Sequence, residues 1–137
     1  CGSAALSRWM TPSPNADWWV EESGWWRPDG TQRLLAGQMN DATLEALDPR
    51  EGASLERAVS VNQARSVTEV RPMNKSLVPG GCAFQRAVPS GTRYLSLGPN
   101  DGQTRIHHAN ESIARDKLLQ HALQWRSLLA WFSGVRW

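Results

Sequence analysis

The clearest hydrophobic pattern in the chain lies near its end, where apolar residues recur at intervals of four and three. These residues are Leu118, Ala122, Trp125, Leu129 and Phe132. The spacing places them on one face of an α-helix, and four neighbours widen that face: Leu119, Leu123, Leu128 and Trp131. The polar positions gather on the other side, at Asp116, Gln120, Gln124 and Ser127. We therefore predict a long C-terminal helix that packs its apolar stripe on a sheet.

Both ends of this helix carry capping signals. Asn110 is the predicted N-cap, and Glu111 follows it in the first turn, where the helix dipole favours an acid. Gly134 is the residue at which the helix is expected to end.

The middle of the chain alternates between apolar and polar residues, a pattern typical of strands. The alternation is loose over 66–71 and clear over 82–88 and 94–97. Turn residues at 89–91 and 99–102 separate the second strand from the third, and the third from a fourth at 104–108. Consecutive strands with short turns predict an antiparallel β-meander.

The N-terminal third begins with a loop-like segment and a cluster of tryptophans. Two Trp pairs, Trp18-Trp19 and Trp25-Trp26, flank a Glu-Glu-Ser-Gly turn. We interpret them as a hairpin whose aromatic rings stack across the strands. The alternative, two helical turns, is disfavoured by Gly24 and Pro28.

The segment from 31 to 47 has a helical composition. Asn40 or Asp41 is a plausible N-cap for residues 42–47, and Asp48-Pro49 is expected to end that helix. Ser54 is expected to cap a further helix, which runs to about residue 64 and turns Leu55, Ala58 and Val59 inward.

Together these elements predict an α+β fold in which residues 1–16 are a flexible tether and 17–137 are a single domain. A length of 137 residues supports one core of modest size. Charge is uneven: residues 1–60 carry a net −4 and residues 61–137 a net +6, which sum to +2. We favour packing of one half on the other, and the alternative is an anionic partner for the basic half.

The chain begins Cys1-Gly2-Ser3, followed by small residues. This start resembles that of mature bacterial lipoproteins, a processing class in which the first cysteine carries the lipid. The resemblance implies lipidation of Cys1, and Gly2 implies placement in the outer membrane, facing the periplasm. The alternatives are an arbitrary chain boundary and, more remotely, an N-terminal-nucleophile hydrolase. Cys82 is expected to be a lone buried thiol or the disulfide partner of Cys1.

No sequence motif predicts catalysis, a metal or a cofactor. Phosphate-binding loops and serine elbows are missing from the sequence. His107 and His108 would point to opposite faces of a strand, so one metal ion could not easily bind both. If the chain were an enzyme, Cys82 and these two histidines would be the residues to mutate.

Tryptophan is the one compositional excess, with eight residues. Neighbouring tryptophans on a strand cannot both point inward, so some are expected at the surface as contacts for a partner. The predicted partner-binding residues are Trp18, Trp19, Trp25, Trp26, Trp131 and Trp137.

These features favour a lipid-anchored, non-enzymatic accessory or assembly subunit of a protein complex in the bacterial cell envelope. The first alternative is a module that binds glycan or peptidoglycan through its tryptophans. The second is a nucleic-acid binder that uses basic residues of the C-terminal half. Those residues are Arg65, Arg71, Arg86, Arg93 and Arg105.

Overall fold

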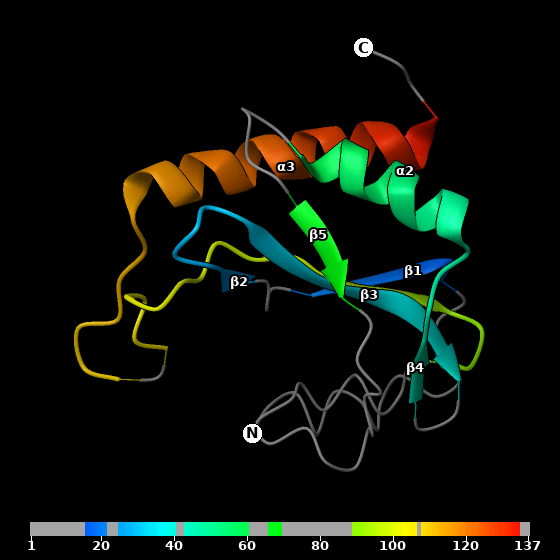
Figure 1. Cartoon of the computed structure of the whole chain (residues 1–137), viewed down its shortest axis with the longest axis horizontal. Helices are drawn as coiled ribbons and strands as arrows, with labels where there is room; N and C mark the ends of the chain where they lie inside the picture. The colour runs from blue at the N-terminus through cyan, green and yellow to red at the C-terminus, as the bar shows by residue number, and fades with distance from the viewer. Residues whose placement is uncertain are drawn as a thin grey trace.

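The computed structural model describes residues 16–21, 25–40, 43–60, 66–69, 89–106 and 108–134. Within these ranges six strands form one mixed sheet, and two helices lie on the same side of it (Figure 1). The predicted α+β class and the C-terminal helix packed on the sheet are confirmed. Cys1, Cys82, Trp137 and nearly all of the predicted tether lie outside the described residues.

The sheet is organised around strand β3 (Gln32–Asn40). It pairs with β6 (Arg93–Ser96) and β2 (Trp25–Trp26) antiparallel, with β5 (Ser66–Glu69) parallel, and with β4 (Thr43–Glu45) antiparallel. Strands β2 and β5 both pair with the first two residues of β3, so they lie on opposite sides of it. Strands β6 and β4 both pair with Gln38, and they too lie on opposite sides.

The predicted helices over 31–47 are wrong, because β3 and β4 form a hairpin there. Burial along β3 alternates, with Leu34 and Ala36 in contact with the helices and Met39 on the opposite face. Residues with good helix propensity therefore form the central strand, because tertiary packing outweighs local preference. Gly37 allows the close approach of β4, since a Cβ there would lie 2.6 Å from Leu44 Cγ and closer still to the Glu45 carbonyl oxygen.

Helix α2 (Pro49–Val59) begins where the sequence predicted a helix to end. The Asp48 carboxylate accepts hydrogen bonds from the backbone N–H groups of Arg50 and Glu51, at 2.9 and 3.4 Å. Proline is well suited to the first helical position, so Asp48-Pro49 is an N-cap signal and Ser54 is not the cap. The inward positions Leu55 and Val59 are confirmed, as both are fully buried.

The predicted Trp hairpin is wrong. Strand β1 (Trp18–Glu21) pairs in parallel with β6, while β2 pairs with β3, so the two Trp pairs lie on different strands of the sheet path β1-β6-β3-β2.

The predicted meander is also wrong within the described residues: β6 forms as a strand, but 104–106 is a turn region. The Asp101 carboxylate holds that region by accepting a 2.8 Å bond from the Gln103 N–H. The predicted strand over 82–88 lies outside the described residues.

Two apolar clusters lie on the two faces of the sheet. The larger one fills the space between the sheet and the helices, and consists of Leu34, Ala36, Leu55, Val59, Leu95, Leu97 and Leu128. The smaller one, on the opposite face, consists of Met39, Leu44 and Tyr94. The predicted division of a Trp pair between faces is confirmed for β1, because Trp18 packs on the larger cluster and Trp19 on the smaller.

Candidate functional site

The C-terminal helix α3 (Arg115–Ser133) turns a different side to the domain from the one predicted. Gln124, predicted to be solvated, is fully buried together with Leu128. Two residues of the predicted inward stripe are largely in solvent, since Leu118 is 52% exposed and Leu129 is 60% exposed, whereas Trp125 is half-buried against the larger cluster. The helix therefore packs on the sheet through a partly polar side, and part of its apolar stripe faces outward.

A chain of buried amides accounts for this orientation. The Gln32 Nε2–H group donates to the Gly98 carbonyl at 3.0 Å, and Gln124 donates from Nε2 to the Gln32 Oε1 and, at 3.0 Å, to the Val59 carbonyl. These bonds join α3 to β3, to the loop after β6 and to the end of α2. A buried amide N–H group is tolerated when it is hydrogen-bonded, so the two bonds of Nε2 favour the rotation of α3 that buries Gln124, although the Gln124 Oε1 is buried without a partner among the described residues.

Two further contacts hold the ends of α3. Near its start the Lys117 ammonium lies 4.1 Å from the centre of the Trp26 ring, a cation–π contact. Near its end the Trp131 indole N–H donates to the Ser54 hydroxyl of α2 at 2.9 Å. Gly134, with a positive φ of 70°, ends the helix as predicted. The predicted N-cap is wrong: Ala114 holds that position, without a side-chain capping bond, and Asn110 lies in a turn before it.

We define the outward stripe as the exposed apolar residues on the solvent side of α3: Leu118, Leu119, Ala122, Leu129 and Phe132. At 100° per residue, Arg115 and Arg126 lie on the same side of the helix. A contiguous row of exposed apolar side chains is a candidate interaction surface.

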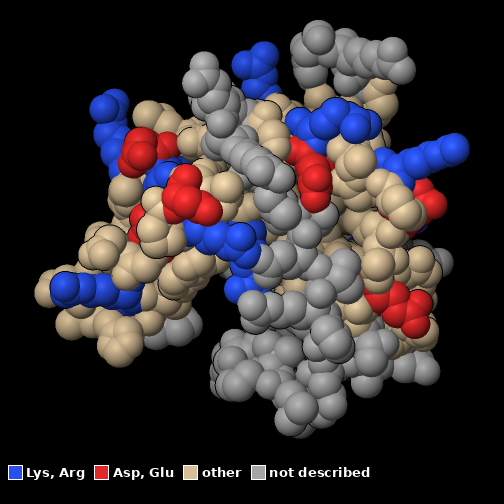
Figure 2. Space-filling model, in the orientation of Figure 1, with Lys and Arg blue, Asp and Glu red and all other residues tan. Residues whose placement is uncertain are grey.

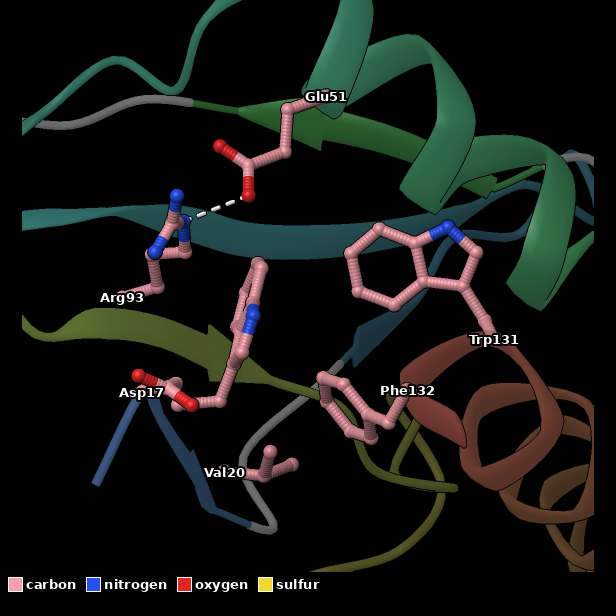
Figure 3. A pocket seen from close by; sticks show the side chains of 7 residues that line it. Asp17, Val20, Glu51, Arg93, Trp131 and Phe132 are labelled. Carbon is pink, nitrogen blue, oxygen red and sulfur yellow. Dashed lines mark ion pairs between the residues drawn. The ribbon is translucent and has the colours of Figure 1, made fainter. Parts of the chain in front are cut away.

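At the end of the outward stripe lies an open pocket of about 560 Å³, which we call the aromatic pocket. It is lined by Asp17, Trp18, Val20, Glu51, Arg93, Trp131 and Phe132 (Figure 3). The lining comes from the edge strand β1, from β6, and from both helices. Phe132 belongs to the outward stripe as well, so the two features form one continuous surface.

Three rings and an ion pair give the aromatic pocket its chemistry. The Trp18 and Trp131 rings meet edge to face with centroids 5.4 Å apart, and the Phe132 ring lies 5.6 Å from Trp18 and 5.3 Å from Trp131. The Arg93 Nε–H group donates to the Glu51 carboxylate at 2.6 Å (Figure 3). Both charged side chains keep contact with solvent, at 41% and 25% exposure.

The other predicted contact residues have different positions. Trp25 is 39% exposed, as expected for one member of its pair, but Trp26 is only 1% exposed. Trp26 packs beneath Lys117 and is therefore unsuited to direct contact with a partner. Trp19 is half-buried on the face of the sheet away from the helices.

A second hollow, of about 410 Å³, lies beside β2 and is lined in part by Trp25, Trp26 and Lys117. The adjacent turn carries Asp29, whose carboxylate accepts hydrogen bonds from the Thr31 hydroxyl at 2.7 Å and the Thr31 N–H at 2.9 Å. These bonds lower the pKa of Asp29. Asp29 thus stabilises the turn beside this hollow.

The described residues contain no group of three or more His, Cys, Asp or Glu side chains arranged to hold a metal ion. None of the helices described is both long enough and apolar enough to span a bilayer.

His121 accepts a 3.0 Å hydrogen bond at Nε2 from the Trp125 indole. On the face shown in Figure 2, acidic and basic side chains are intermingled.

Sequence reasoning identified Trp18 and Trp131 but did not bring them together, and it missed Glu51 and Phe132 as site residues. Arg93 was considered only as a contact for nucleic acid. No local signal could have joined them, because they lie on four elements that only the sheet order and the helix packing make neighbours.

No protein-family model, curated protein or solved structure matches this chain.

Proposed function

We propose that the protein is a non-enzymatic accessory subunit that binds an amphipathic helix of a partner protein along the outward stripe. The observation that carries the proposal is the rotation of α3, which leaves Leu118, Leu119 and Leu129 more than half exposed while Gln124 is buried. A second protein that covered the stripe would remove these apolar side chains from water and would thereby stabilise the complex.

The spacing of the stripe defines what would fit it. Leu118, Ala122, Leu129 and Phe132 follow one another at intervals of four, seven and three residues, a spacing that keeps them on one line along the helix, as in the seam between two packed helices. Burial of the exposed half of a leucine or phenylalanine is worth about 1 kcal/mol. The large residues of the stripe together therefore offer a driving force of about 4 kcal/mol, before the costs of association.

The charged residues beside the stripe indicate which charges a partner helix should carry beside its own apolar side. Arg115 and Arg126 lie on the stripe side of α3. A second copy of the same helix would bring arginines toward arginines, whereas a partner helix with acidic flanking residues would complement them. The support is therefore for a different protein with an acidic amphipathic helix.

A photo-crosslinking experiment in the native host tests this proposal. A photoreactive amino acid is placed at Leu129, and a matched control carries it at Gln103, which is exposed in a turn outside α3. We expect crosslinks at position 129 to one defined protein, and not at 103, with loss of the crosslink when Leu118→Glu is added. The identified segment of the partner, made as a peptide, should bind the purified protein and lose affinity for the same variant.

Two results would overturn the proposal. One is equal crosslinking from positions 129 and 103, which would mean that the stripe is not selective. The other is crosslinking only between copies of this chain, with a dimer in light scattering that Leu129→Glu dissociates. The lipid at Cys1 and the envelope location stay predictions, because Cys1 lies outside the described residues.

A further inference from the structure

We propose that the aromatic pocket binds a neutral sugar ring, as a site adjacent to the helix-docking stripe. The observations that carry this inference are three aromatic rings beside a paired arginine and glutamate, in a hollow of about 560 Å³. That volume lies within the range of small-molecule sites. The pocket shares Phe132 with the stripe, but its other lining residues lie outside the stripe, so sugar binding can be tested on the chain without any partner helix.

The aromatic side of the pocket matches one side of a pyranose. A sugar ring has an apolar face of C–H groups, and indole or phenyl rings bind such a face through their large apolar surface. Trp18 and Trp131 are half-buried, and the Trp131 N–H is bonded to Ser54. The Trp131 ring is thus held in a fixed orientation, which lowers the entropy lost on binding.

The charged residues of the pocket suit the hydroxyl groups at the edge of the same sugar ring. Each sugar hydroxyl both donates and accepts hydrogen bonds. Glu51 and Asp17 supply acceptors, and the Arg93 guanidinium supplies planar N–H donors. Acceptors and donors in one hollow, beside apolar rings, are what a polyhydroxylated ring requires.

The ion pair also argues against a purely apolar ligand. Such a ligand would cover the Arg93–Glu51 pair and leave it without water, at a cost in desolvation. A quaternary ammonium would meet the Arg93 guanidinium as well as the carboxylates of Glu51 and Asp17, so choline is the comparison that tests this class. A neutral ring with hydroxyls can bond to the charged groups without covering them with apolar surface.

Nuclear magnetic resonance of the indole N–H groups tests the inference on the full chain. The probe is N,N′-diacetylchitobiose, and choline chloride is the cationic comparison. We expect the sugar to shift the Trp18 and Trp131 signals, with a dissociation constant in the millimolar range, and to leave the Trp25 signal in place. Choline should shift none of them.

Variants locate the binding and separate it from folding. Arg93→Ala should weaken the sugar at least about tenfold, since a hydrogen bond to a charged group is lost. Glu51→Gln, which keeps the shape of the side chain, should weaken it less. The control Arg57→Ala removes an exposed arginine of α2 that does not line the pocket, and it should bind as the parent does.

Each other outcome overturns the inference. Absence of shifts at saturating sugar, shifts that survive Arg93→Ala in a folded variant, or stronger shifts with choline than with sugar would do so. Leu129→Glu should leave sugar binding unchanged. Failure of the helix-docking proposal is therefore distinguishable from failure of this one.

Discussion

Two neighbouring leucines of α3 provide the sharpest test of how the helix is oriented. Leu128 is fully buried and Leu129 is 60% exposed, although the sequence pattern predicted that both contribute to one apolar face. Leu128→Ala and Leu129→Ala make the same chemical change one residue apart, in the same helix. Any effect of helix propensity is therefore nearly equal for both, and the difference reports burial.

The magnitudes follow from the exposed fractions. Truncation of a fully buried leucine costs about 2–5 kcal/mol, because apolar contacts are lost and a cavity remains. For Leu129 less than half of the side chain is removed from water, so Leu129→Ala is expected to cost about 0.5–1 kcal/mol. The expected difference in the free energy of unfolding between the two variants is about 1–4.5 kcal/mol.

Urea unfolding of both variants, followed by far-ultraviolet circular dichroism, measures this difference. The slope of free energy against urea should match that of the parent chain, so that the midpoints report stability alone. Equal losses for the two variants, or a larger loss for Leu129→Ala, would refute the orientation of α3. In that case the stripe would face the sheet, and the basis for helix docking would be gone.

Three further changes test the fold around the site. Gln124→Met keeps the size of the side chain but removes the two buried hydrogen bonds that Gln124 donates to Gln32 and to the Val59 carbonyl, so unfolding in urea should show a loss of about 1–3 kcal/mol; an unchanged midpoint would contradict the amide network. Gly37→Ala should destabilise by at least about 1–3 kcal/mol, whereas Gly52→Ala, in open space on α2, should be neutral or stabilising by up to about 1 kcal/mol. Asp48→Ala should cost about 0.5–2 kcal/mol in thermal or urea unfolding, and Asp48→Asn much less, because asparagine also caps.

Local signals in the sequence predicted the elements whose cause is local. The alternation over 94–97 became β6, and Gly134 ended α3 because only a residue tolerant of positive φ suits that position. Leu55 and Val59 were placed correctly because a four-residue interval fixes one face of a helix. Asp48-Pro49 was misread because the same pair of residues is compatible with the end of one helix and the start of the next.

Non-local pairing determined what the sequence could not show. Strand β3 has a composition that suits a helix, yet it is the centre of the sheet, paired on both sides by segments from distant parts of the chain. The two Trp pairs, seven residues apart, were assigned to one hairpin. Strand β1 pairs instead with β6, which lies much later in the sequence. The aromatic pocket depends on these pairings, and so it had no signature in the sequence.

The orientation of α3 connects these results. A hydrophobic pattern shows that a helix has an apolar side. It does not show whether the rest of the domain or another protein covers that side. An apolar side chain is stabilised by contact with any apolar surface. The polar atoms of a buried amide, in contrast, need hydrogen-bond partners that lie at specific positions and in specific directions. The Gln124 Nε2 group has such partners in Gln32 and the Val59 carbonyl, 92 and 65 positions away in the chain. Because these polar contacts are more directional than apolar ones, they favour the rotation of the helix that buries Gln124, and that rotation leaves Leu118 and Leu129 exposed.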